Sequence, residues 1–196
     1  MNSAALIETI TQLISPLITA QGLKLWGIEL INIPQPIIKI FVDTIETNRL
    51  HENNIINSKS EQITIEQCAS LSRLIGLTLE VEELFPNKWT LEVSSPGLER
   101  SFFTIQQLSN YINHDIDVTL KEQHPLWPNR KKFYGTLISI TDNTFMLNLS
   151  LAHRKSDEPE NVSINWQQVR KATLVHHFFQ PNKKLGSTKG LNGGTT

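Results

Sequence analysis

The spacing of apolar residues changes near residue 104 of this 196-residue chain, and this change constrains the fold more than any other feature. Before that point, apolar side chains recur every three or four residues over two long segments, as on one face of a helix. After it, apolar and polar residues alternate in short runs, as in half-buried strands. The sequence therefore predicts an α+β protein with two domains, residues 1–103 and residues 104–180, followed by a disordered tail at residues 181–196.

The first domain is predicted to be a small α/β unit in the order helix, strand, strand, helix, strand, with both helices on one face of the sheet. The first helix ends near Gly22, and the runs 23–33 and 37–43 are strand-like. Between those runs, Pro34 and Pro36 cannot both be paired within a central strand, so they predict a hairpin turn. The apolar stripe of the first helix consists of Leu6, Ile10, Leu13, Ile14 and Leu17.

A capping box at Thr64 and Gln67 predicts where the second helix begins, because each of these side chains can bond the other residue's backbone amide. Residues 88–93 then alternate between apolar and polar, which predicts the third strand. Residues 44–62, which precede the second helix, are polar and rich in asparagine and predict an exposed loop. The apolar stripe of the second helix consists of Cys68, Leu71, Ile75 and Leu79.

The second domain is predicted to be a small all-β barrel of the SH3-like or Sm-like kind. Five short strand-like runs occupy about sixty residues there, and no long helix interrupts them. Turn residues such as Asp142 and Asn143 separate the runs. The five runs are residues 116–120, 133–140, 145–149, 162–166 and 169–175.

A tight turn follows the last strand of the first domain, in the motif formed by Ser94, Ser95, Pro96, Gly97 and Arg100. Proline presets φ for such a turn and glycine supplies the positive φ of its type II form, so the motif predicts a rigid exit from the strand. A serine-dependent hydrolase is the alternative interpretation. Its nucleophile turn requires Gly-x-Ser-x-Gly spacing, which this motif does not have, so the structural interpretation is preferred.

The sequence predicts no metal site, no cofactor and no catalytic activity. The six histidines lack the spacing of a zinc-binding helix, and no phosphate-binding loop follows a strand. The single cysteine, Cys68, excludes a disulfide framework and lies on an apolar stripe, so it is expected to be a core residue. No run approaches the roughly 18 uninterrupted apolar residues of a membrane span, and the N-terminus lacks a basic signal region. We therefore expect a cytoplasmic protein with no membrane partner.

Charge is divided unequally between the two halves of the chain. Residues 1–100 carry seven Lys and Arg against twelve Asp and Glu, a net charge of −5, whereas residues 101–196 carry eleven against seven, a net charge of +4. Basic residues of the second half lie near strand ends, where the loops of a small barrel converge, so they can form one patch for phosphates or for an acidic protein surface. Ordinary solubilising charge is the other interpretation. These residues are Arg130, Lys131, Lys132, Arg154, Lys155, Arg170 and Lys171, with Lys121 nearby.

Three aromatic residues are interleaved with these charges, as stacking on RNA bases requires. They are Trp127, Phe133 and Tyr134. The pattern supports a second interpretation equally well, in which Phe133 is a core residue and Trp127 covers a loop.

The motif Trp89-x-Leu91-Glu92-Val93-Ser94-Ser95-Pro96-Gly97-Leu98-Glu99-Arg100 resembles the signature of the RimP family of ribosome maturation factors. Stretches at residues 21–29, 40–43 and 164–175 are also similar to the family, and the resemblance keeps its order over residues 5–178. The chain departs from the family in its long insertion at residues 44–62. It also has Ser101 where a proline is common.

The resemblance implies a non-enzymatic, cytoplasmic bacterial factor that binds the small (30S) ribosomal subunit and assists its late assembly. The implied partners are rRNA and a ribosomal protein near the decoding centre, bound by a monomer. The implied fold, an α/β domain followed by an Sm-like barrel, agrees with the order predicted above. Two alternatives stay open: a general Sm-like RNA-binding protein, which would form rings, and a hydrolase that uses Ser94 or Ser95.

Deletion of residues 181–196 is expected to leave the melting temperature within a few degrees of that of the full chain, because this segment has no apolar face to bury. Thermal unfolding followed by circular dichroism measures the difference. A larger fall in the melting temperature would show that the tail packs against one of the domains.

Overall fold

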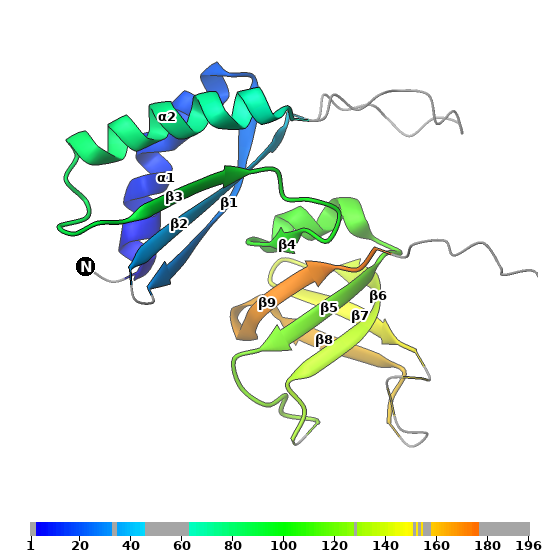
Figure 1. The fold of residues 1–196 in the computed structure, drawn as a ribbon. Helices are drawn as coiled ribbons and strands as arrows, with labels where there is room; N and C mark the ends of the chain where they lie inside the picture. The colour runs from blue at the N-terminus through cyan, green and yellow to red at the C-terminus, as the bar shows by residue number, and fades with distance from the viewer. Residues whose placement is uncertain are drawn as a thin grey trace, which may run out of the picture.

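The structure is a computed structural model, and it describes residues 3–32, 35–45, 63–127, 129–150, 152, 154 and 158–176. Its strands form two sheets, one of three strands in the first half of the chain and one of six strands in the second half (Figure 1). The two long helices belong to the first half. The predicted α+β class is therefore confirmed. The tail at 181–196 and residues 46–62 of the predicted loop lie outside the described residues.

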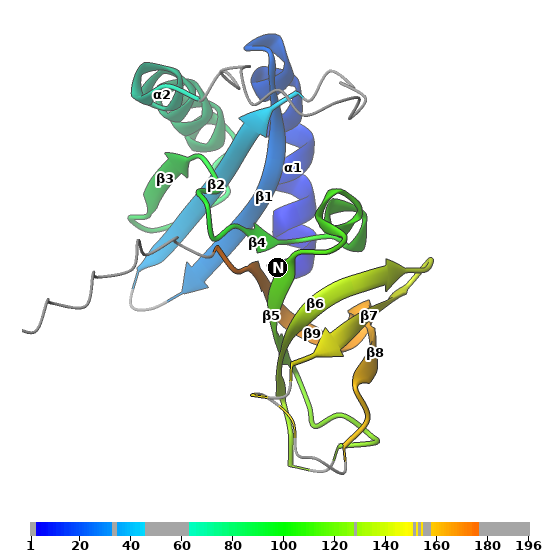
Figure 2. The same ribbon diagram turned by 90° about the vertical axis from the view of Figure 1, so that its right-hand side faces the viewer.

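The first half has the predicted order of elements: α1 (Ser3–Ala20), β1 (Leu23–Asn32), β2 (Pro36–Thr44), α2 (Ile65–Val81) and β3 (Thr90–Ser94). Strand β1 runs antiparallel to β2, and β2 runs parallel to β3. Both helices cover the same face of this sheet and contact each other (Figure 2). The opposite face is left for contact with the second half of the chain.

Local sequence signals set the ends of both helices. At the start of α2 the predicted capping box forms, because the Gln67 N–H donates to Thr64 Oγ1 (3.2 Å) and the Thr64 N–H donates to Gln67 Oε1 (2.9 Å). Helix α1 is followed by Gly22, whose φ of +72° lies in the left-handed region that favours glycine. Nine buried residues form the centre of the core: Ile10, Ile14, Ile18, Ile38, Ile40, Val42, Leu71, Ile75 and Leu79.

Helix α1 is long and apolar enough, by length and composition, to cross a membrane, with a mean hydropathy of 1.2 over 18 residues. In this fold, however, Ile10, Ile14 and Ile18 of the helix are fully buried against α2 and the sheet. The apolar stripe of α1 therefore has a place in the core of the first half.

Six strands of the second half wrap around a second core. They are β4 (Ser101–Phe102), β5 (Asp115–Leu120), β6 (Lys132–Ile140), β7 (Thr144–Leu149), β8 (Asn161–Asn165) and β9 (Val169–Leu174), accompanied by the 3-10 helices η1 (Ile105–Tyr111) and η3 (Trp166–Gln168). The order in the sheet is β4-β9-β5-β6-β7-β8. In the described residues the edge strands β4 and β8 are not paired with each other, so the sheet is open between them.

The five strands expected in the second half are all present, but three short elements are not evident from the sequence pattern. Strand β4 and η3 have two and three residues, which is too few to show a hydrophobic period. In η1 the buried Ile105 and Leu108 are three residues apart, a spacing that repeats too few times to predict a helix. Trp166, which we expect at the end of a strand, begins η3 instead. The second core contains Ile116, Val118, Phe133, Leu137, Phe145, Leu147, Val162 and Ile164.

A β-bulge at Trp26 brings the first sheet into contact with the second half. The pairing of β1 with β2 shifts between Leu25 and Gly27, so Trp26 is an additional residue in β1. Leu25 and Ile28 consequently both pack with the helices, although they are three residues apart. Trp26 packs instead in the second core, where it is buried.

The ring of Phe103 packs directly on the backbone of Gly27. A Cβ atom at this glycine would lie 2.0 Å from Phe103 Cδ2, which is closer than any real contact allows. Phe103 also contacts Phe41 of β2, the cross-strand partner of Gly27, with ring centroids 5.7 Å apart. Phe103 therefore joins the two halves through an apolar contact that needs a glycine beneath it.

Replacement of Gly27 by alanine is expected to lower the free energy of unfolding by about 1–3 kcal/mol, because the added methyl group displaces the Phe103 ring. Gly76→Ala in α2 is the matched control, since a Cβ there would meet only Leu91 Cδ2, at 3.9 Å. Because alanine stabilises a helix by about 1 kcal/mol relative to glycine, Gly76→Ala is expected not to lower the free energy of unfolding. Unfolding in urea measures both changes. A similar response of the two variants would contradict the packing at Gly27.

Candidate functional site

The ends of three neighbouring strands bring five cations together at one exposed rim. Thr119, near the end of β5, is opposite Lys132 on β6 and Lys171 on β9. Because neighbouring strands lie about 4.8 Å apart, the backbones of these two lysines are about 10 Å apart on the same face. We call this group the basic rim. It consists of Lys121, Lys131, Lys132, Arg170 and Lys171, and all five are exposed.

Backbone hydrogen bonds place the other members of the basic rim beside this pair. The Leu120 N–H donates to the Lys131 carbonyl (2.7 Å), and the Lys121 N–H donates to the Gln168 carbonyl (2.8 Å). Lys121 therefore lies between the beginnings of β6 and β9. A shift in the pairing of β5 with β9 leaves Arg170 as the additional residue of a bulge.

Arg130 and Arg154 occupy a different environment from the basic rim. Arg130 Nη1 lies 3.0 Å from Glu158 Oε2. Arg154 Nη1 donates to the Glu158 carbonyl (3.0 Å) and Nη2 pairs with Glu160 Oε1 (2.9 Å), while its side chain is only 9% exposed. These bonds tie the segment between β7 and β8 to the loop before β6, so both arginines have structural partners. Lys155 lies outside the described residues.

Two of the three aromatic residues proposed to stack on bases are core residues. Phe133 and Trp127 are buried in the second core, so the stacking interpretation is wrong for them. Tyr134 is half-buried, and its hydroxyl donates to Asp115 Oδ2 (3.0 Å). Burial raises the pKa of Tyr134, and the hydrogen bond to Asp115 raises it further. The hydroxyl therefore remains protonated at neutral pH and serves as a donor to the carboxylate.

Carboxylates at the other end of β5 give this face of the sheet a charge gradient. Asp115 Oδ1 accepts a hydrogen bond from Thr136 Oγ1 (2.7 Å). Asp117 is exposed and lies opposite Tyr134 on β6. The strand thus begins among carboxylates and ends at the basic rim, so the local potential favours an anionic partner at the rim.

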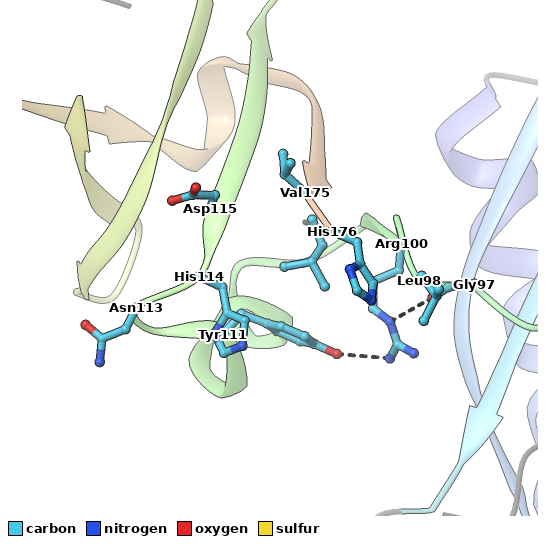
Figure 3. A pocket seen from close by; sticks show the side chains of 10 residues that line it. Gly97, Leu98, Arg100, Tyr111, Asn113, His114, Asp115, Val175 and His176 are labelled. Atoms are coloured by element: carbon cyan, nitrogen blue, oxygen red, sulfur yellow. Dashed lines mark hydrogen bonds between the residues drawn. The ribbon is translucent and has the colours of Figure 1, made fainter. Parts of the chain in front are cut away.

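Arg100 of the turn motif connects the two halves of the chain. Its Nη1 donates to Tyr111 Oη (2.9 Å), and its Nε donates to the Gly97 carbonyl (3.3 Å) (Figure 3). The same Nη1 donates to Asp43 Oδ2 of β2 (2.8 Å). The guanidinium also lies over the ring of Trp26, 4.9 Å from its centre. Gly97 has the positive φ (+73°) that the motif predicts. The motif therefore ends in a residue that joins β2 of the first sheet to η1 of the second half.

An open cleft of about 460 Å³ lies beside Arg100 (Figure 3). Tyr111, His114 and His176 are among the residues that line it. The serines considered as nucleophiles, Ser94 and Ser95, are exposed and are not part of its lining. In the described ranges, no three His, Cys, Asp or Glu side chains form a group that could hold a metal ion.

Comparison with known proteins identifies similar chains over nearly the whole length. A family model described as the RimP N-terminal domain matches residues 13–99. A protein named Ribosome maturation factor RimP, from Nitratidesulfovibrio vulgaris, is 39% identical over 94% of this chain and 98% of its own length. A protein of the same name from the Miyazaki F strain of that species is 35% identical, over 96% of this chain and 92% of its own length. Another protein of this name, from Desulfovibrio desulfuricans, is 28% identical, over 93% of this chain and 84% of its own length.

Replacement of Arg100 by methionine is expected to lower the free energy of unfolding by about 2 kcal/mol, because the Asp43 carboxylate loses its charged hydrogen-bond partner. The Asp43 side chain is only 16% exposed, so water replaces that partner poorly. Lys39→Met is the matched control, since the pair of Lys39 with Glu92 is more exposed (32% and 48%) and is expected to contribute little. Denaturant unfolding measures both variants, and equal losses would contradict the role of Arg100.

Proposed function

Since the chain belongs to the RimP family of ribosome maturation factors, we propose that it assists the assembly of the small (30S) ribosomal subunit. In this proposal it binds an immature subunit through rRNA, a ribosomal protein near the decoding centre, or both. It acts as a cytoplasmic monomer, without a cofactor and without catalysis. The name that its relatives share supports the maturation role.

The basic rim is the observation that carries this proposal. Its five side chains are exposed at strand ends, where the second core does not require them. In the part of the chain that the structure describes, the ion pairs of the second half involve Arg130 and Arg154 and none of the rim residues. Cations of this kind bind phosphate oxygens, and binding releases counterions from the RNA, so the affinity must fall with added salt.

A maturation factor changes an assembly equilibrium only if it binds immature and mature subunits with different affinities. Attraction between the basic rim and phosphates does not provide that difference, because every RNA carries phosphates. A fixed spatial arrangement of the binding surfaces can provide this difference in affinity. We propose that the chain has the two predicted domains, 1–103 and 104–180, although β4 (Ser101–Phe102) already belongs to the second sheet. In this proposal Arg100 and Phe103, at the boundary, hold the basic rim in a fixed position relative to the first sheet.

The double variant Lys131→Glu, Lys171→Glu is expected to bind small subunits more weakly while folding normally. The slope of log affinity against log salt concentration should fall by about one unit for each phosphate contact that is lost. Co-sedimentation of the purified protein with small subunits at several salt concentrations measures both effects. Substitutions of exposed side chains of this kind usually change stability by less than about 0.5 kcal/mol.

The matched control is Arg73→Glu, Lys88→Glu, which changes the net charge equally but on exposed residues of the first half. This control is expected to bind as the wild type does, because the rim is intact. Undiminished binding by the rim variant, with an unchanged circular dichroism spectrum, would show that the rim is not the surface that binds the subunit. The acidic first half would then be the next candidate for that surface.

A further inference from the structure

The loop between β5 and β6, of which residues 121–127 and 129–131 are described, carries an exposed apolar side chain. Leu126 is 78% exposed. The loop lies at the end of the second sheet that points away from the first half (Figures 1 and 2). Lys121 and Lys131 of the basic rim stand at the base of this loop, where Lys131 Nζ lies 3.5 Å from the Lys121 carbonyl. The loop thus carries one exposed leucine and has two of the rim cations at its base.

Backbone hydrogen bonds give the tip of this loop a fixed shape. The Trp127 N–H donates to the His124 carbonyl (3.0 Å), and the Arg130 N–H donates to the Trp127 carbonyl (3.1 Å). The His124 N–H in turn donates to the Arg130 carbonyl (3.1 Å). The side chain of Trp127 is buried against Phe133, with ring centroids 5.9 Å apart. Leu126 therefore lies between residues that are anchored in the fold.

The buried ring of His124 fastens the loop to β8. Its Nδ1 accepts a hydrogen bond from the Leu126 N–H (3.2 Å), and its Nε2 lies 3.0 Å from the Ser163 carbonyl oxygen. Because Nδ1 is an acceptor, Nε2 carries the ring proton and donates to that carbonyl. The backbone of Leu126 is thus held by a core side chain, whereas its own side chain stays in water.

A single exposed leucine is common on soluble proteins and indicates nothing by itself. Leu126 differs because its described neighbours His124 and Trp127 are already held by hydrogen bonds, so that contact with a partner costs little conformational freedom. The cations at the base of this loop indicate the chemistry of that partner, since a rim of lysine and arginine complements a phosphate backbone.

We infer that Leu126 packs against an unstacked base or a ribose of rRNA while the basic rim holds the phosphates beside it. Unstacked bases occur in the loops and bulges through which proteins recognise RNA. This inference rests on the proposed function. It adds an apolar contact to the electrostatic one, and the two contacts respond differently to salt.

The test measures binding of the full chain to protein-free small-subunit rRNA at salt concentrations of about 50–250 mM. Leu126→Ala is expected to weaken binding about tenfold at each salt concentration, as the loss of one buried apolar side chain implies. The slope against salt should stay unchanged, because no charge is removed. Leu77→Ala on α2 is the matched control, since Leu77 is also exposed (63%), and it should bind as the wild type does.

Leu126→Trp separates an RNA partner from a protein partner. An indole stacks on bases, so this variant is expected to bind rRNA at least as tightly as the wild type does. Wild-type affinity of Leu126→Ala for rRNA would overturn the inference. A loss seen with complete subunits but not with rRNA would also overturn it, because Leu126 would then contact a ribosomal protein.

Neither of these outcomes affects the proposed function, which depends on the weaker subunit binding of Lys131→Glu, Lys171→Glu. Failure of the inference and failure of the proposed function are therefore distinguishable. Circular dichroism of each variant confirms that a change in affinity does not come from unfolding.

Discussion

Packing of Phe103 on the bare backbone of Gly27 is the contact on which the arrangement of the two halves depends. The bulge at Trp26 is required for it, because the additional residue turns this part of β1 toward the second core. Arg100 adds a polar contact at the same place by bonding both Asp43 and Tyr111. Apolar packing sets the separation of the two sheets, and charge-assisted hydrogen bonds add geometric specificity. The basic rim, at the far end of the second sheet, thereby keeps a defined position.

Most of the fold could be predicted because its signals are local. The capping box at Thr64 and the alternation in β5 to β9 depend on residues close together in the sequence. The bulge at Trp26 and the short strand β4 could not be predicted, because contacts between distant residues define them. Trp26 Nε1 donates to the Ser101 carbonyl, 75 residues along the chain. Nothing near Trp26 in the sequence indicates that partner.

The candidate site was predictable in its charge but not in its detail. Strand ends place Lys132 and Lys171 on the two strands that flank β5, at the same rim. The sequence does not distinguish these lysines from Arg130, because the partner of Arg130, Glu158, comes from a different loop. Leu126 was not predicted either. A leucine beside a tryptophan indicates two apolar residues, and only the packing of Trp127 on Phe133 in the folded structure shows that Leu126 is the one left in water.

Charge alone cannot give a maturation factor its selectivity, since phosphates are equally present on immature and mature RNA. Selectivity has to come from parts of the chain whose shape is fixed, and two such parts are the junction at Phe103 and the loop that carries Leu126. In our proposal the rim and Leu126 must reach the RNA together. Once assembly buries the base that Leu126 contacts, or moves it relative to the phosphates, both contacts cannot form at once. The affinity then falls to that of the rim alone, so release follows from geometry and requires no catalysis.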